Sequence, residues 1–358
     1  MPENRQLRCL IAAGGTVGHV APSLAVAEAL RARGVEVTFA GSPDRVEAQL
    51  VPERGYAFDA FRVAGFPRRP GLRLARALAL AAASPVACLR ILGRRRPDVV
   101  LGAGGYVAGP MVLAAWLRRI PAALTEADAH LGLANRLAAP FAQRLFLAYP
   151  VDGVNGKARV VGRPIPSTSQ AVARDEARRR FELPQEGPVV LVFGGSLGAR
   201  TLNETAVEAW GAEGPAVLHL SGERDYEELR GRVSRQDYRL LPFVDDFGAA
   251  LAAADIVVAR AGGSVWEVAA AGKPAILVPY PDATANHQWK NADYFDRAGG
   301  AEIVDDAQAR TRVPLLVTDL LGDAARLAEM GAAMRAAAKP DAAERIADEL
   351  IVLATARR

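Results

Sequence analysis

Residues 12–20 read AAGGTVGHV, between an apolar stretch, LRCLIAAGG (7–15), and a helical pattern, APSLAVAEAL (21–30). An apolar run that ends at two glycines and passes into a helical pattern predicts a strand, a tight turn and a helix. Glycine lets the backbone N–H groups of such a turn approach a ligand, and the helix start directs its unpaired N–H groups to the same point. The turn is therefore a candidate anion site, although glycines at strand ends also serve only to tighten a turn.

The opening turn recurs along the chain. Ala103-Gly-Gly-Tyr-Val107 and Ala261-Gly-Gly-Ser-Val265 repeat it, and Phe193-Gly-Gly-Ser-Leu197 is a close variant. Each copy follows an apolar run and opens a helical pattern, and two of the four turns fall in each half of the chain. This arrangement predicts two Rossmann-like domains whose glycine-rich edges face each other across a cleft.

Apolar, β-branched runs alternate with helical patterns throughout. The runs are VEVTFA (35–40), DVVLGA (98–103), AALT (122–125), RLFLA (144–148), PVVLVF (188–193), AVLHL (216–220), DIVVA (255–259) and PAILVPY (274–280). Such alternation is typical of βαβ units, so we predict the α/β class with doubly wound parallel sheets.

The expected domains follow from the same pattern. We predict an N-terminal domain of residues 1–163, a C-terminal domain of residues 164–338, and a final helix in residues 339–358 that packs on one of the two. Residues 162–188 are polar and have prolines near both ends, so they are expected to connect the domains.

Composition indicates an ordinary folded protein. The chain has 358 residues, of which 51% are hydrophobic and 23% charged, so it is long enough for two domains and unlike a disordered chain. Its two cysteines, Cys9 and Cys88, lack the spacing of a metal site or a disulfide framework, and we expect no tightly held metal. The apolar stretch of residues 72–92 is interrupted by arginine and proline, so we expect no transmembrane segment, and none of the sequence predicts a signal peptide.

Residues 60–97 contain nine arginines and no acidic residue, interspersed with apolar side chains. This composition is typical of a segment that lies on an anionic membrane surface. A solvated arginine face of a surface helix has a similar composition. Nucleic acid is not an expected partner, because the segment has too few aromatic residues for base stacking.

The glycine turns of this sequence do not match two common nucleotide-binding motifs. A dinucleotide fingerprint needs G-x-G-x-x-G and an acidic residue about 20 residues on. The chain has instead Gly14-Gly15-Thr16-Val17-Gly18, and Gly41 stands where the acidic residue is required. No glycine turn continues as Gly-Lys-Ser or Gly-Lys-Thr, which excludes a Walker-type phosphate loop. A nucleotide-sugar transferase with a phosphate-holding turn in each domain fits better.

Eight further motifs occur in a fixed order between Leu7 and Ile351: GGTVGHVAPSLAVAEAL, GSPDRVEAQLV, GGYVAGPMVLAAW, VVGRPI, GGSLGARTLNE, FVDDFGAALAAADIVVARAGG, EVAAAGKPAILVPY and HQWKNA. In order and spacing they resemble the MurG family of glycosyltransferases (family 28, GT-B fold). The resemblance implies inverting transfer of N-acetylglucosamine from UDP-N-acetylglucosamine to the C4 hydroxyl of undecaprenyl-pyrophosphoryl-N-acetylmuramyl pentapeptide, in peptidoglycan synthesis. It also implies a peripheral enzyme at the cytoplasmic face of the cell membrane that needs no cofactor.

The resemblance assigns substrate contacts in both predicted domains. In the C-terminal domain, Ser196 is expected to contact phosphate, Val244 the uracil, Glu267 the ribose hydroxyls and Gln288 the sugar. The remaining residues expected to contact substrate are Gly262, Gly263, Ser264, Val265 and His287 in that domain, and Gly15, Thr16, Val17, Tyr106, Asp128 and Arg163 in the N-terminal domain.

His19 is the candidate general base. It stands on the first helical turn beside the glycine loop, where a neutral imidazole could take the proton of the attacking hydroxyl. Glu126 is the alternative base, and each of the two could instead have a structural role. The sequence departs from the family pattern at Val17, Asp128 and Pro166. These differences bear on the expected contacts with the donor and the acceptor rather than on the expected fold.

Three other functions stay open at this level. The same fold could transfer the sugar to a diacylglycerol-type lipid, epimerise a UDP-sugar without any lipid, or bind a nucleotide without catalysis.

Overall fold

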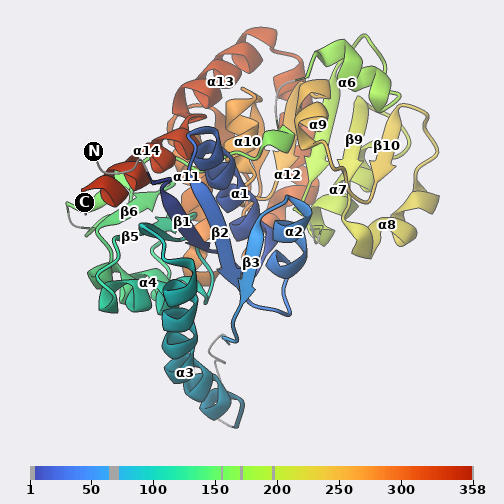
Figure 1. Ribbon diagram of the computed structural model, residues 1–358. Coiled ribbons are helices and arrows are strands. Elements are labelled where there is room, and N and C mark those ends of the chain that lie inside the picture. The colour runs from blue at the N-terminus through green and yellow to red at the C-terminus, as the bar shows by residue number, and fades with distance from the viewer. Residues whose placement is uncertain (1–4, 64–71, 155, 170–171, 196–197, 357–358) are drawn as a thin grey trace. The chain divides into compact units, whose positions relative to one another are not determined.

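The computed structural model describes residues 5–63, 72–154, 156–169, 172–195 and 198–356, except for the side chains of residues 72–82 and 168. The chain forms two compact units (Figure 1): Met1–Pro166 together with Pro340–Arg358, and Ser167–Lys339. We call them unit 1 and unit 2. Part of the arginine-rich stretch (64–71) and the predicted phosphate contact Ser196 lie outside the described residues.

Unit 1 is built on a seven-stranded sheet in the spatial order β3-β2-β1-β4-β5-β6-β7. Every pair of neighbouring strands is parallel. In chain order the strands are β1 (Arg8–Ala12), β2 (Glu36–Gly41), β3 (Ala57–Ala60), β4 (Val99–Gly102), β5 (Ala122–Glu126), β6 (Arg144–Leu147) and β7 (Ala158–Val160).

Helices pack on both faces of this sheet because alternate residues of each strand point to opposite sides. Cys9 and Ile11 of β1 belong to a core shared with one group of helices, and Leu10 and Ala12 belong to a core shared with another. The first group is α1 (Val17–Ala32), α2 (Glu47–Glu53) and α14 (Ala342–Thr355); the second is α3 (Leu72–Arg95), α4 (Ala108–Leu117) and α5 (Leu133–Ala138).

Unit 2 contains a six-stranded parallel sheet in the order β10-β9-β8-β11-β12-β13. Its strands are β8 (Val189–Phe193), β9 (Ala216–Leu220), β10 (Tyr238–Leu241), β11 (Ile256–Ala259), β12 (Ala275–Leu277) and β13 (Ala301–Ile303). Its helices are α6 (Arg174–Arg180), α7 (Arg200–Trp210), α8 (Glu223–Leu229), α9 (Phe247–Ala253), α10 (Val265–Ala270), α11 (His287–Arg297), α12 (Ala309–Leu321) and α13 (Ala324–Ala337). The predicted α/β class with two parallel sheets is confirmed.

The C-terminal helix α14 packs on unit 1. Ile346 and Leu350 lie in the same core as Val20 and Leu24 of α1, and Figure 1 shows α14 beside α1. The side chain of Asp341 makes no hydrogen bond to the backbone at the start of α14; it accepts one from Arg345 Nε over 2.6 Å.

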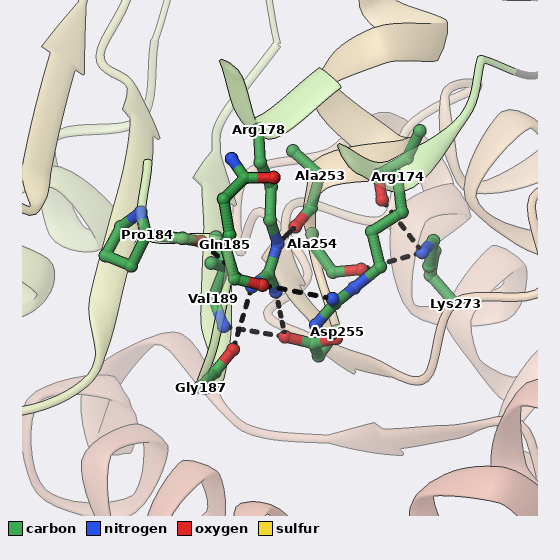
Figure 2. Close-up of polar contacts among 11 residues, drawn as sticks. Arg174, Arg178, Pro184, Gln185, Gly187, Val189, Ala253, Ala254, Asp255 and Lys273 are labelled. Carbon is green, nitrogen blue, oxygen red and sulfur yellow. Dashed lines mark hydrogen bonds and ion pairs between the residues drawn. The ribbon is translucent and has the colours of Figure 1, made fainter. Parts of the chain in front are cut away.

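Most of the predicted connection, residues 162–188, belongs to unit 2 and is not a linker. Arg178 of α6 is fully buried and donates to Asp255 Oδ2 over 2.7 Å and to the carbonyl oxygens of Ala253, Pro184, Gln185 and Gly187 (Figure 2). Asp255 also accepts a hydrogen bond from Val189 N–H at the start of β8. The polar composition of residues 162–188 predicted a connection between the domains, but Arg178 fixes α6 to the amino ends of β8 and β11.

None of the helices in the described part of the chain is both long enough and apolar enough to cross a membrane.

Candidate active site

The glycine turn after β1 has the predicted strand–turn–helix form. Gly15 has a φ of +102°, a conformation that favours glycine, and α1 begins at Val17. Val17 is a helical residue and is exposed, so this departure from the family pattern that the sequence resembles introduces no backbone strain. The Gly15 N–H donates to the carboxylate of Glu47, a buried residue that the sequence analysis did not single out.

His19 lies at the first turn of α1, in contact with the turn that follows β4. Its Nδ1 is 3.1 Å from the hydroxyl oxygen of Thr16, and a Cβ on Gly104 would lie 2.5 Å from its Cδ2 atom. The pKa of His19 lies below its ordinary value of 6.5, chiefly because of burial and next because of the positive charge of Arg163. The imidazole is therefore mainly neutral at pH 7, as a general base must be.

Arg163 and Asp128 act on the same imidazole from two other loops. Arg163 Nη2 donates to the carbonyl oxygen of Gly18, which ties the loop after β7 to the start of α1. Asp128 lies beyond the end of β5, and its negative charge opposes the effect of Arg163 on the pKa of His19. Unit 1 thus brings together four of the residues predicted from sequence: Thr16, His19, Asp128 and Arg163.

Glu126, the alternative base, holds the loop of residues 127–132 and the start of α5. Its Oε1 accepts from Ala127 N–H over 3.0 Å and Asp128 N–H over 3.4 Å, and its Oε2 accepts from Gly132 N–H and Asn135 Nδ2, both over 2.9 Å. Burial raises its pKa in spite of these donors. Both oxygens are occupied, so the geometry favours a structural role for Glu126 and leaves His19 as the better candidate base.

The second turn of unit 1 packs directly on the first. Gly104 and Gly105 have φ values of +96° and +73°. A Cβ on Gly105 would lie 2.1 Å from the carbonyl oxygen of Gly14, so the two turns touch through their backbones. Tyr106, the predicted acceptor contact, follows this turn and is exposed.

Gly105→Ala should lower the free energy of unfolding of unit 1 by about 1–3 kcal/mol, because alanine is strained at this φ and its methyl group meets a backbone oxygen. Urea unfolding followed by circular dichroism measures the loss. Gly109→Ala is the matched control, since Gly109 lies within α4 and a Cβ there would meet no atom within 4 Å beyond its chain neighbours and the backbone of its own helix. Equal stability of the two variants would contradict the close packing of the turns.

In unit 2 the turn after β8 is tightly packed as well. A Cβ on Gly194 would lie 2.3 Å from the Cβ of Ala199, and one on Gly198 would lie 2.0 Å from the carbonyl oxygen of Ser221. Asn203 of α7 supports this turn, because its Nδ2 donates to the Ser221 carbonyl oxygen over 2.9 Å. Asn203 was not predicted as a site residue.

The turn after β11 contains Gly262, Gly263 and Ser264 and leads into α10, which begins at Val265. Glu267 lies in the first turn of α10, and the hydroxyl of Ser169, in the 3₁₀ turn Ser167–Ser169, donates to its Oε1. The carboxylate predicted to hold ribose hydroxyls therefore already binds a hydroxyl group of this chain.

Helix α11 meets this turn. Gln288 and His287 begin α11; the Oε1 of Gln288 accepts from Tyr280 N–H, and the Nδ1–H of His287 donates to the carbonyl oxygen of Thr284, both over 2.9 Å. Asn291 Nδ2 donates to the Ala261 carbonyl oxygen over 3.1 Å, which fixes α11 to the turn. Val244 lies in the loop between β10 and α9, half-buried. Asn291 could have been identified from the sequence, because it belongs to the motif HQWKNA that also contains Gln288.

Two parallel sheets, each with glycine-rich turns at the carboxyl ends of its strands, define a two-domain nucleotide-binding protein of the GT-B class. Among the residues that the structure describes, no three His, Cys, Asp or Glu side chains are grouped so that they could hold a metal ion.

Comparison with known proteins narrows this class. Residues 9–147 match the glycosyltransferase family 28 N-terminal domain, and residues 189–346 match the family 28 C-terminal domain. The chain belongs to glycosyltransferase family 28. It is similar to the UDP-N-acetylglucosamine--N-acetylmuramyl-(pentapeptide) pyrophosphoryl-undecaprenol N-acetylglucosamine transferases of Cronobacter sakazakii (42% identical, 98% of each chain covered) and Salinibacter ruber (40%, 96% of each). It is also similar to the crystal structure of Acinetobacter baumannii MurG, with a TM-score of 0.78 and 27% identity over 97% of this chain and 99% of that one.

Proposed function

We propose that this protein transfers N-acetylglucosamine from UDP-N-acetylglucosamine to the C4 hydroxyl of undecaprenyl-pyrophosphoryl-N-acetylmuramyl pentapeptide, with inversion at the anomeric carbon. The names of its near-full-length relatives carry this proposal. Unit 1 supplies the base and the acceptor contacts, and unit 2 binds the donor.

His19 is the general base in this proposal. If Nδ1–H donates to the Thr16 hydroxyl, Nε2 is the unprotonated nitrogen that accepts the proton of the attacking hydroxyl. Tyr106 and the turn around it are the proposed contacts of the acceptor diphosphate, and Gly15, Thr16 and Val17 are proposed to lie where the acceptor meets the donor sugar. Asp128 and Arg163 are further proposed substrate contacts. Burial, and next the charge of Arg163, lower the pKa of His19 and so favour the neutral imidazole.

Unit 2 binds UDP-N-acetylglucosamine in this proposal. The backbone N–H groups at the turns after β8 and β11 stabilise the charge that develops on the leaving UDP. No cofactor is needed for this displacement. Glu267 binds the ribose hydroxyls, while Val244, Gly262, Gly263, Ser264, Val265, His287 and Gln288 complete the donor site together with Ser196.

Glu267→Gln should weaken UDP binding by about 10- to 100-fold, because a neutral amide accepts weaker hydrogen bonds than a carboxylate. Isothermal titration calorimetry with UDP measures the change. Glu228→Gln, on the exposed face of α8 in the same unit, is the matched control and should leave the affinity unchanged. An unaltered affinity in Glu267→Gln would remove Glu267 from the donor site.

We further propose that unit 1 docks on the cytoplasmic face of the membrane as a peripheral protein. In the described part of the arginine-rich segment, Val86 and Arg90 of α3 are exposed. Trp116 and Leu117 at the end of α4 are about half exposed (49% and 53%), and Arg118 and Arg119 follow them directly. Apolar side chains beside arginines fit an anionic lipid surface.

Trp116→Ser combined with Leu117→Ser should weaken binding to anionic lipid vesicles at least about 10-fold, because it removes the apolar part of this surface. Co-sedimentation with vesicles containing phosphatidylglycerol measures the binding. Leu315→Ser, which changes an exposed leucine of unit 2, is the control. If both proteins bind equally, the docking surface lies elsewhere.

Turnover with UDP-N-acetylglucosamine and a short-chain form of the lipid-linked muramyl pentapeptide tests the function itself. A disaccharide product with inverted configuration is the expected result. Transfer only to diacylglycerol, or a product formed from UDP-N-acetylglucosamine without any lipid, would identify a different reaction.

A further inference from the structure

Glu47, in the first turn of α2, is a buried acidic residue that the proposed reaction does not use. Its side chain has no exposed surface. Its Oε2 accepts a hydrogen bond from Gly15 N–H and its Oε1 accepts one from Ser42 N–H, each over 3.0 Å. Gly15 lies in the turn after β1, and Ser42 directly follows β2. One carboxylate therefore joins the turns at the ends of two neighbouring strands.

Two glycines leave room for this carboxylate. A Cβ on Gly14 would lie 2.2 Å from Glu47 Oε1, and a Cβ on Gly41 would lie 2.7 Å from Glu47 Cγ. Either side chain would displace the carboxylate or the turn. Gly41 stands where a dinucleotide-binding protein has its acidic residue, and in this chain the space beside it is filled by Glu47. The departure from that fingerprint has a physical reason.

The same turn also meets Gly104 and Gly105, in the turn after β4. Gly105 lies against the carbonyl oxygen of Gly14, and Gly104 lies against the imidazole of His19. The turn thus contacts both the Glu47 carboxylate and the backbone that follows β4. A shift of the turn toward the space of Glu47 would move His19 with it, since α1 starts at the end of the turn.

We propose that Glu47 is a positioning residue for the transfer reaction: its carboxylate fixes the turn after β1 and thereby the place of the His19 imidazole. This inference rests on the proposed role of His19. Glu47 itself contacts neither substrate; it acts through the Gly15 N–H and through its charge.

The charge of Glu47 reaches His19 as well. Burial and Arg163 lower the pKa of His19, whereas Asp128 and Glu47 raise it. Removal of the Glu47 charge, with Arg163 and Asp128 left in place, should lower the pKa of His19 further. A residue that only filled space would not have this effect.

Glu47→Gln tests the proposal with little change of size. An amide has a single acceptor oxygen, so its NH₂ group must face either Gly15 N–H or Ser42 N–H, and one of the two hydrogen bonds is lost. We expect kcat/KM to fall by about 10- to 100-fold. The matched control is Glu53→Gln, the same substitution at an exposed position of the same helix; it should change nothing.

Two NMR measurements give results that do not depend on activity. The imidazole signals of His19 should titrate at lower pH in Glu47→Gln than in the unmodified protein. The Gly15 amide proton should move upfield, because it loses a charged acceptor or gains a neutral one. If both signals stay unchanged in the folded variant, the proposal is wrong. If both signals move as expected but no acceptor is glycosylated by the unmodified protein, the proposed function fails and the role of Glu47 in the turn stands.

If Glu47→Gln does not fold, hydrogen exchange in the unmodified protein tests the hydrogen bond between Gly15 N–H and Glu47 instead. The Gly15 N–H should exchange much more slowly than that of Gly18, which lies on the exposed side of the helix start. Equal exchange rates at the two glycines would overturn the proposal.

Discussion

Replacing His19 with alanine should lower kcat by about 10²- to 10⁴-fold, the range found for the loss of a general base. The Kd for UDP should change little, because the proposed donor contacts lie in unit 2. The reason for the large effect is geometric and electrostatic together. Thr16 fixes one ring nitrogen, Gly104 supports the ring, and the lowered pKa of His19 keeps the other nitrogen available.

The pH dependence has a definite sign. A base acts in its unprotonated form, so kcat/KM should be constant above the pKa of His19 and fall as the pH drops through it. Since burial and Arg163 hold this pKa below 6.5, activity should persist at pH values where an ordinary histidine is already protonated. The acidic limb should disappear in the residual activity of His19→Ala.

Glu126→Gln is the comparison that separates the two candidate bases. The amide cannot satisfy all of the donors around Glu126, so a moderate loss of activity is expected through a shift of residues 127–132 and the start of α5. If Glu126→Gln abolishes turnover and His19→Ala retains it with an unchanged pH profile, the assignment of the base must be reversed.

The sequence predicted the inner strands of both sheets and missed the outer ones. The eight predicted runs became β2, β4, β5, β6, β8, β9, β11 and β12, and the opening apolar run became β1. The four strands that were not predicted, β3, β7, β10 and β13, are the edges of the two sheets. Inner strands of a parallel sheet are buried on both faces and read as continuous apolar runs. Edge strands such as AFDA and AEI are partly exposed and carry charged residues, so their pattern is indistinct.

The site was predictable where backbone chemistry determines the residue type. Gly15, Gly104, Gly105 and Gly195 have positive φ, and their glycine pairs were visible in the repeated turns. Contacts between residues far apart in the chain were not predictable. The hydrogen bond from Gly15 to Glu47 spans 32 residues, and no periodic pattern marks its acceptor. The same reason explains why Glu126 stayed an alternative base beside His19 until its hydrogen-bond donors were known.

Asp255→Ala should lower the free energy of unfolding of unit 2 by about 3 kcal/mol, because it leaves the buried Arg178 without its counter-charge. This value is the lower end of the range for broken buried ion pairs, since the Asp255 side chain is 27% exposed and Arg178 keeps its carbonyl acceptors. The substitution also removes the acceptor of Val189 N–H at the start of β8. Figure 2 shows how these groups converge on Asp255.

Urea unfolding of the full chain, followed by tryptophan fluorescence and circular dichroism, measures this loss. Glu228→Ala is the control in the same unit: it removes an exposed partner of Arg200, and its cost should stay below about 1 kcal/mol. Asp255→Ala removes the carboxylate partner of the buried Arg178 and of the exposed Arg174, whereas Glu228→Ala removes that of the exposed Arg200, so the buried arginine is the main difference between the variants. Similar losses in the two variants would mean that water reaches Arg178 and that α6 is not fixed to the sheet through this pair. A large loss confined to Asp255→Ala would instead show that RDEARRR, which has the composition of a surface segment, contains the residue that anchors the start of unit 2.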